Sequence, residues 1–303
     1  MSVLLMWFRN LQIFRLTSEW AYSTESLSAA LHKGLFHGCG ATDRVARGWV
    51  PPRDDGELVF SVQRQQLIAL GVEQKLLPAS VVRQYAQAKL IEIEAAQGYK
   101  PGRKQSREVA DQLEAELLPR AFVKRGLTYV WIDPVNRWLL VDASSSTRAD
   151  EVMEHLKLSL GELPLTLVKT QLAPATAMTQ WLAAGEAPGN FTIDRDCELC
   201  AAADERPAVR YVRHNLDSEE VRAHIAGGKT ATRLALTWNE RISFVLTEQL
   251  QIKRLVFLDL IKEDAERQAE NADDLFAADF TLMAGELAQL LGHLLEVLGG
   301  EGE

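Results

Sequence analysis

Apolar residues near the N-terminus follow more than one spacing. The segment LLMWFRNLQIFRL is rich in aromatic and branched side chains with partial alternation, which predicts a strand. Residues 24–34 show a helical pattern, and the prolines of GWVPP (48–52) make that segment extended or a turn. LVFSVQRQQLIAL, from residue 58, predicts one or two further strands. This mixture predicts an α+β fold rather than a series of βαβ units.

The next segment has a helical period. From Ser80 to Ala96 the apolar side chains recur at helical spacing, and the glycines and proline of GYKPGRKQS (98–106) then break the helix. Ser106 is expected to cap a second helix, which Pro119 ends. Two helices of similar length joined by a short turn predict an αα-hairpin that projects its turn away from the body.

The second half of the chain alternates between strand and helix patterns. TYVWIDPVNRWLLVDASS (128–145) predicts a β-hairpin, and ADEVMEHLKLSLGELP predicts a helix that ends near Gly161. DSEEVRAHIAGG predicts a helix capped by Asp217, and strands with a bend near Asn239 follow it. Apolar residues between Phe280 and Leu298 form a broad helical face at the C-terminal end.

Composition places the chain among soluble globular proteins. Of its 303 residues, 47% are hydrophobic and 25% are charged, and no apolar run approaches the length that crosses a bilayer. Three cysteines are too few for a disulfide framework and suit a reducing compartment. We therefore expect a cytoplasmic protein without a membrane partner.

Charge is distributed unevenly along the chain. The formal net charge is -9, but residues 259–303 contain twelve Asp or Glu against Lys262 and Arg267, so the remainder of the chain is close to neutral. Residues 81–125 carry nine Lys or Arg and six Asp or Glu. Such segregation allows one face to be basic in an acidic protein.

Basic residues gather in the turn of the predicted helical hairpin. They are Lys100, Arg103, Lys104 and Arg107. A solvated loop explains them, and so does contact with phosphates, because cations at a protruding tip neutralise a polyanion at little desolvation cost. The sequence alone leaves both readings open.

Motifs for catalysis or metal binding are incomplete. Gly228-Lys229-Thr230 resembles the end of a phosphate-binding loop but lacks the required earlier glycine. Cys197 and Cys200 form a C-x-x-C without a second ligand pair, so two ordinary cysteines are favoured over a zinc or redox site. Asp273, Asp274 and Asp279 precede the closing helix, where acids favourably oppose its dipole, so a metal-dependent nuclease is disfavoured. We expect no catalytic residue, metal or cofactor.

Many short motifs in order resemble one protein family. MWFRNLQIFRL, GWVPP, LLPASVVRQ, LLPRAF, WIDPVNRWLLVDASS, SLGELPL, DSEEVRAHIAGGKTATRLALTWNERISFVL and ADFTLMAGELAQLLGHLLEVLGGE together resemble the bacterial recombination-associated RdgC family. The resemblance extends from the first predicted strand to the last helix. It implies a non-enzymatic protein that binds double- and single-stranded DNA regardless of sequence and is associated with the nucleoid.

The resemblance also implies an architecture. The family fold is α+β, with a central antiparallel or mixed sheet domain (residues 1–78 and 118–168), a protruding helical-hairpin tip (79–117) and an α+β base domain (169–303). Two copies form a ring-shaped homodimer that encircles duplex DNA and opposes RecA-mediated recombination. A regulator that contacts the recombinase directly is the alternative, motivated by the acidic C-terminal region.

Site residues carry over from this resemblance. Phe122 of LLPRAF falls at the contact between tips that acts as the gate of the dimer, although a Phe packed in its own subunit is the other reading. His214 accompanies the inward-facing cations of the base. The complete set of expected DNA-binding residues is Lys100, Arg103, Lys104, Arg107, Arg120, Lys124, Arg210, Arg213, Lys229, Arg233, Lys253 and Arg254.

Overall fold

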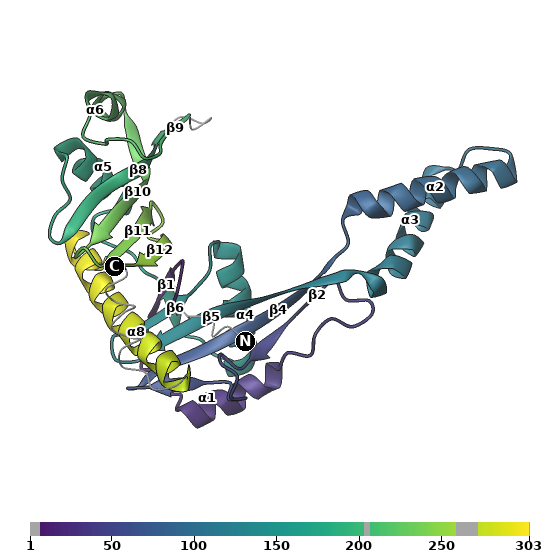
Figure 1. The fold of residues 1–303 in the computed structure, drawn as a ribbon, viewed down its shortest axis with the longest axis horizontal. Coiled ribbons are helices and arrows are strands. Elements are labelled where there is room, and N and C mark those ends of the chain that lie inside the picture. Colours follow the sequence, from purple (N-terminus) through teal and green to yellow (C-terminus); the bar gives the residue numbers. More distant parts are fainter. Residues whose placement is uncertain (1–6, 203–206, 259–271, 303) are drawn as a thin grey trace.

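The chain folds into a curved molecule with a long projecting arm. The structure is a computed structural model, and it describes residues 7–202, 207–258 and 272–302. A sheet occupies the middle, a helical hairpin extends from one end of it, and a second sheet rises at the other end (Figure 1). The arm and the second sheet lie on the same side of the central sheet, so the molecule has a concave side between them (Figure 1).

The central sheet has seven strands among the described residues, and the strand pairs are antiparallel. Its order is β2-β4-β5-β6-β1-β7, and β3 pairs with β4. The strands are β1 (Gln12–Leu16), β2 (Val45–Val50), β3 (Phe60–Val62), β4 (Gln65–Leu76), β5 (Phe122–Asp133), β6 (Trp138–Val141) and β7 (Leu165–Leu167).

One face of the central sheet packs on two helices. These are α1 (Thr24–Leu31), which the short 3-10 helix η1 (His32–Gly34) follows, and α4 (Ser146–Leu160). Leu27, Leu31, Val152 and Leu156 of these helices are buried against apolar residues of the sheet, including Val130. The predicted hairpin at residues 128–145 is confirmed as β5 and β6, and the predicted helix end at Gly161 is confirmed as the C-cap of α4.

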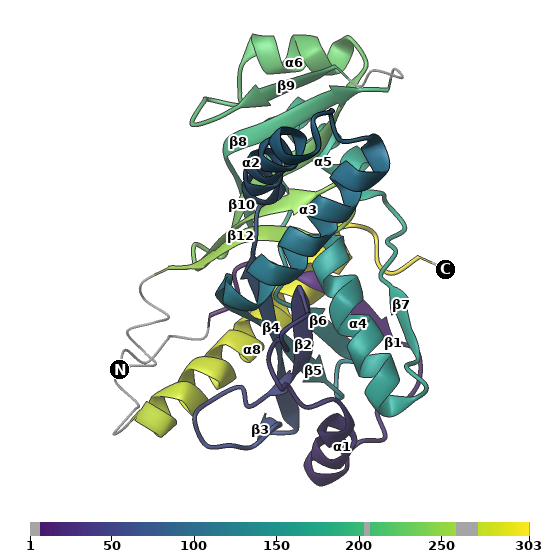
Figure 2. The same cartoon turned by 90° about the vertical axis from the view of Figure 1, so that its right-hand side faces the viewer.

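The arm is the predicted αα-hairpin. It consists of α2 (Ala79–Gln97) and α3 (Arg103–Leu117), and the 3-10 helix η2 (Leu118–Arg120) leads back to β5. The long strands β4 and β5 pair as far as Leu76 and Phe122, so the arm grows directly from the sheet. The structure describes every residue of α3, and none of them is buried, because the arm stands away from both sheets (Figure 1). In Figure 2 the arm points towards the viewer, in front of the sheets.

The second sheet has five antiparallel strands in the order β12-β11-β10-β8-β9. The strands are β8 (Phe191–Ala201), β9 (Ala208–Tyr211), β10 (Lys229–Trp238), β11 (Ile242–Thr247) and β12 (Ile252–Phe257). Three helices accompany it: α5 (Pro174–Ala184), α6 (Glu219–Ala226) and α8 (Ala272–Val297). The fold class is therefore α+β with antiparallel sheets, as expected; the domain bounds stay a prediction.

Helix α8 joins the two sheets through a shared core. Phe280, Met283 and Leu287 are fully buried in a cluster that includes Phe8 and Trp131 of the central part. The cluster also contains inward residues of α5 and of the five-stranded sheet. Burying this much apolar surface between the sheets is a strong stabilising term, which fixes the angle between them.

The expectation that no apolar segment is long enough to cross a bilayer does not hold for helix α8. Among the described residues it is long and apolar enough to cross a bilayer by length and composition. Its apolar side chains recur at helical spacing and are interrupted by polar residues, so a count of consecutive apolar residues does not detect it. Three aspartates expected before this helix lie inside it: Asp273 and Asp274 in its first turn, and Asp279 further along, where it is buried. Part of the acidic region, residues 259–271, lies outside the described residues.

Three predicted element boundaries were wrong: two helix caps and one strand start. Gly102, not Ser106, is the N-cap of α3, so Arg103 begins the helix, and the Ser106 hydroxyl donates to the Gly102 carbonyl at 3.0 Å. Ser218, not Asp217, caps α6 through its hydroxyl. The first strand of the predicted hairpin begins at Phe122, six residues before the predicted start at residue 128, because β5 pairs with β4 from Phe122 to Ile132.

Candidate nucleic-acid interface

One face of the five-stranded sheet carries no helix within the part of the chain that the structure describes. Helices α5 and α8 pack on the opposite face, and the free face turns towards the concave side of the molecule (Figure 1). Side chains alternate between the two faces along a strand. On β8, Cys197 and Leu199 enter the core, whereas Glu198 lies between them on the free face.

A shallow pocket on this face brings four expected DNA-binding residues together. They are Arg210, Arg233, Lys253 and Arg254, which come from β9, β10 and β12. Two carboxylates, Asp196 and Glu198, line the same pocket. Four cations against two carboxylates leave the pocket positive, so it can attract an anion.

Glu198 lies directly between two of these arginines. It pairs across the sheet with Arg210 of β9 on one side and with Arg233 of β10 on the other. Arg210 donates to it through Nε at 3.1 Å and through its terminal nitrogen, and Arg233 Nε lies 3.6 Å from its Oε1. Burial opposes ionisation of Glu198, but the hydrogen bonds from Arg210 and Thr232 outweigh it and lower the pKa of this carboxyl. Glu198 is therefore an ionised partner of both arginines.

The other two cations of the pocket are held differently. Arg254 is 77% exposed and lies 3.5 Å from the Asp196 carboxylate. Lys253 is half-buried, and burial together with the charge of Arg233 lowers its pKa. An anion that binds beside Lys253 would favour its charged form and so oppose this lowering of the pKa.

The remaining base residues lie outside this pocket. The Arg213 backbone N–H donates to Asp196 at 2.8 Å, but the side chain lines a neighbouring hollow with Asp217. Lys229, at the start of β10, is 3.2 Å from a ring nitrogen of His224. His214 is exposed and contacts the Asn215 carbonyl. Four of the expected DNA-binding residues of the base therefore cluster in the pocket, whereas Arg213 and Lys229 lie outside it.

The arm carries its four predicted cations at the far end. Lys100 lies in the turn, and Arg103, Lys104 and Arg107 lie on the first turns of α3, where the sequence had placed them in a loop. Lys104 and Arg107 are 93% and 86% exposed, and their carboxylate partners are 3.9 and 4.0 Å away. Such loose, exposed pairs contribute little, so these cations are available to a polyanion.

Phe122, at the root of the arm, is 85% exposed. This excludes packing of Phe122 within its own chain. Arg120 and Lys124, on either side of it in the sequence, are exposed as well. An exposed aromatic ring beside two cations is typical of a contact surface.

The third cation of this stretch, Arg125, has a structural role. Its Nε donates to Glu73 at 2.6 Å across the β4–β5 pair, and the backbone N–H of Cys39 donates to the same carboxylate at 2.9 Å. These two contacts, led by the Cys39 N–H, lower the pKa of Glu73. Lys75 donates to the carbonyls of Gly40 and Ala41, which fixes the same loop against the root of the arm.

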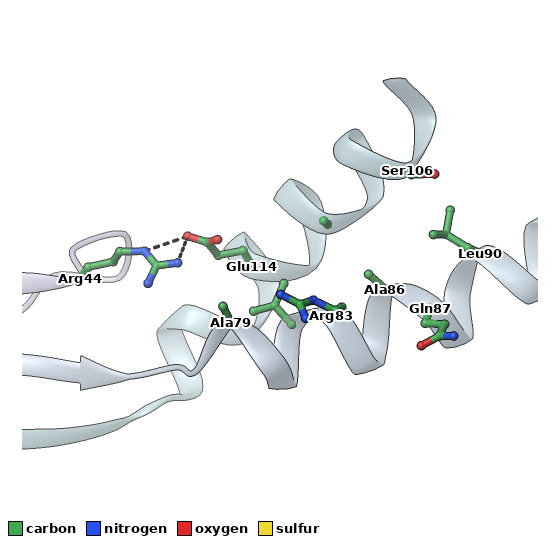
Figure 3. Close-up of a pocket in the computed structure, with 10 residues that line it drawn as sticks. Arg44, Ala79, Arg83, Ala86, Gln87, Leu90, Ser106 and Glu114 are labelled. Atoms are coloured by element: carbon green, nitrogen blue, oxygen red, sulfur yellow. Dashed lines mark hydrogen bonds and ion pairs between the residues drawn. The ribbon is translucent and has the colours of Figure 1, made fainter. Parts of the chain in front are cut away.

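A groove runs between the two helices of the arm. Arg44 bonds Glu114 of α3 at the root, and Arg83 of α2 lies between the helices (Figure 3). Small residues, including Ala86 and Ala110, line the groove. Arg44 therefore ties α3 to the segment before β2 at the root, and near the tip the Gln105 side chain of α3 donates to Gln97 of α2 at 3.2 Å.

The cysteines and acids form no metal site in the parts of the chain that the structure describes. Within those parts, no group of three or more His, Cys, Asp or Glu could hold a metal ion. Cys197 and Cys200 lie in β8 and are buried, and burial raises the pKa of Cys197 to about 12. A thiol with this pKa is a poor nucleophile and metal ligand at neutral pH. Lys229 and Thr230 lie on a strand rather than in a phosphate-binding loop.

Sequence reasoning missed the carboxylates of the pocket. Asp194, Asp196 and Glu198 recur at every second position of β8, a pattern that indicates one face of a strand. The pairing of Glu198 with an arginine on each side depends on strand order, which the sequence does not show.

This arrangement defines a class: an α+β protein with a basic pocket on an open antiparallel sheet and a basic arm, on one concave side. The family model described as "RdgC: Putative exonuclease, RdgC" matches residues 6–301. The recombination-associated protein RdgC of Dechloromonas aromatica (strain RCB) is 54% identical over 299 residues, which cover 98% of each chain. Proteins of the same name from Janthinobacterium sp. (strain Marseille) and Cupriavidus pinatubonensis are 50% and 51% identical, over 98% of this chain and 99% of theirs. The chain belongs to the RdgC family.

Proposed function

We propose that this protein is a sequence-independent DNA-binding protein that closes as a ring-shaped homodimer around duplex DNA and limits the access of RecA to it. The observation that carries the proposal is the position of the cations. Strands β9, β10 and β12, which carry the pocket cations, and the arm helices, which carry the others, lie at the two ends of one concave side (Figure 1).

The chemistry of these cations favours phosphate contacts over base recognition. The pocket lies on a sheet face, and the arm cations lie on an exposed helix end, so they meet the outside of a duplex first. Phosphate contacts position a protein on DNA and carry no sequence information. Binding is then independent of sequence and falls steeply with salt.

The exposed Phe122 supports closure by a second copy. An exposed aromatic ring at the arm root is available to a partner arm, and burying such a ring anchors an interface. Two curved chains that meet at their arms and bases enclose a hole. Enclosure keeps DNA bound even when each phosphate contact is weak. A RecA filament cannot form on DNA that the ring occupies.

No catalytic step is part of this proposal. The family description names an exonuclease, whereas the names of the curated relatives refer to recombination. Cleavage of end-labelled DNA that a chelator abolishes would overturn the non-enzymatic proposal. We expect DNA of unchanged length after prolonged incubation with Mg²⁺ or Mn²⁺.

The test of the ring compares circular and linear duplexes of equal length and sequence. We expect both to bind at low salt, and the circle to be retained after a salt challenge that releases the linear form from its ends. Absence of binding at low salt, or affinity that salt leaves unchanged, contradicts DNA binding itself. Equal release of circle and linear DNA contradicts the ring alone.

Variants that lack the cations distinguish inhibition through DNA occupancy from the alternative, direct contact with the recombinase. Neutralising the pocket and arm cations should abolish inhibition of RecA-promoted strand exchange if inhibition requires DNA occupancy. Inhibition that survives in such a variant supports direct contact.

A further inference from the structure

Glu198 has a position that the binding of DNA alone does not explain. An acidic side chain in a basic pocket lowers the attraction of that pocket for phosphate. Glu198 is nevertheless 14% exposed and lies beneath arginines that are 63% and 47% exposed. The carboxylate is therefore an integral part of the pocket, and the guanidinium groups above it face solvent.

Both carboxylate oxygens of Glu198 have partners. Oε2 accepts two bonds from Arg210, and Oε1 accepts from the Thr232 hydroxyl at 3.0 Å and faces Arg233 Nε at 3.6 Å. A carboxylate and a phosphate present the same kind of oxygen pair to a guanidinium group. Glu198 thus occupies donors that a DNA phosphate would use.

The fold builds this arrangement into the sheet. A register shift between Ala231 and Arg233 of β10 puts Arg233 directly opposite Glu198, and regular pairing puts Arg210 opposite it on β9. Opposite charges on neighbouring strands stabilise a sheet by a few tenths of a kcal/mol to about 1 kcal/mol per pair. The three residues are therefore held as a unit before any ligand arrives.

We propose that Glu198 is a built-in counter-ion that competes with DNA phosphates for Arg210 and Arg233, and so keeps the affinity of the base below what its cations could supply. This inference rests on the proposed DNA-binding function. As a consequence, the phosphate contacts of the two arginines are weak and exchange rapidly, because the Glu198 carboxylate replaces each phosphate that leaves. Such contacts let a protein that encloses DNA move along it.

A different role for the same residue makes the opposite prediction. If Glu198 acts mainly by orienting the arginines towards DNA, its neutralisation weakens binding. Arg210 turns its Nε and a terminal nitrogen to Glu198, and these two donors are the pair that could hold a phosphate in two parallel bonds. Competition for this donor pair is therefore favoured over orientation.

The test substitutes Glu198→Gln in the full chain and measures binding to a fluorescent duplex of about 30 base pairs at several salt concentrations. We expect affinity near 0.1 M salt to rise about five- to tenfold, and the slope of log K against log salt to steepen by about 0.9, the value for one additional phosphate contact. Unchanged or weaker binding overturns the inference. Wild-type protein that binds no DNA fails the proposed function instead, so the two failures are distinguishable.

The matched control is Asp194→Asn. It removes the same charge from the same strand, but Asp194 accepts from the Thr237 hydroxyl rather than from an arginine. We expect less than about a twofold change, because Asp194 accepts from a hydroxyl and occupies none of the arginine donors that a phosphate would use. An increase equal to that of Glu198→Gln would show a general charge effect and overturn specific competition.

A double-mutant comparison isolates the contact. In a background of Arg210→Gln and Arg233→Gln, the Glu198→Gln substitution should recover no more than the Asp194→Asn control does. A full five- to tenfold gain in that background contradicts competition through these arginines. Circular dichroism and thermal unfolding of each variant show whether the sheet is intact. The sheet should survive Glu198→Gln, because the amide side chain keeps an oxygen that accepts from the Thr232 hydroxyl.

Discussion

The base and the arm hold their cations in contrasting ways. In the base, Arg210 and Arg233 share a carboxylate that lies largely beneath them, and Arg254 lies 3.5 Å from Asp196. On the arm, Lys104 and Arg107 extend into solvent with partners 3.9 and 4.0 Å away. The base cations are fixed and partly neutralised, whereas the arm cations are mobile and close to their full charge.

This difference follows from how many buried contacts each region makes. The five-stranded sheet packs one face into the large core, so its free face can present fixed side chains. In the arm, α2 buries Val82 and Ala86, and the fully described α3 buries no residue. A region with few buried contacts holds long side chains loosely. Substitutions on the arm should therefore change binding without unfolding the protein.

The largest effect is expected from the base. Replacing Arg210, Arg233, Lys253 and Arg254 by Gln removes four cations and leaves Asp196 and Glu198 facing the DNA. We expect affinity near 0.1 M salt to fall by about three orders of magnitude and the salt dependence to flatten. Fluorescence anisotropy over a salt series measures both quantities. A loss below about tenfold would place the DNA elsewhere.

A smaller loss is expected from the arm. Replacing Lys100, Arg103, Lys104 and Arg107 by Gln keeps the helix, since Gln has a helix propensity close to that of Lys. We expect affinity to fall by about tenfold to a hundredfold, because a protruding tip contacts few phosphates at once. An arm variant that loses more affinity than the base variant reverses the comparison.

Phe122→Ala should affect closure more than binding. The ring is exposed in the single chain, so its removal leaves the thermal unfolding midpoint unchanged. We expect the salt-resistant retention on circular DNA to fall several-fold, while initial binding to a short linear duplex changes less than about twofold. Val135→Ala, at another exposed apolar residue, is the control. Equal retention by Phe122→Ala and wild type contradicts the gate.

The smallest effect concerns the root of the arm at low pH. The Cys39 N–H and Arg125 lower the pKa of Glu73 in the folded protein below its ordinary value of 4.5. Stability from this group is therefore fully present above pH 4.5 and is lost as pH falls through the lower folded pKa. We expect Glu73→Gln to be less stable than wild type at neutral pH and to show a shallower loss below pH 4.5. Thermal unfolding at neutral pH and below pH 4.5 measures this. An equal difference in melting temperature between wild type and Glu73→Gln at the two pH values would contradict this role.

Local patterns predicted the elements of the arm well, and the error lies at the start of α3. The apolar spacing of α2 and the stop at Pro119 located the hairpin. The helix start moved from Ser106 to Arg103, because a backbone in extended conformation at Gly102 suffices as a cap when solvent hydrates the free N–H groups. The salt bridge between Arg125 and Glu73 depends on strands β4 and β5 being adjacent, which no local pattern shows.

By itself, the sequence determined the α+β class, the projecting hairpin and the residue types able to meet phosphates, because hydrophobic period and turn chemistry are local properties. The tertiary structure decided which cations act together. Arg210, Arg233, Lys253 and Arg254 come from three strands, and strand order brings them into one pocket. It also placed Glu198 between two arginines, because cross-strand neighbours are fixed by register rather than by separation along the chain.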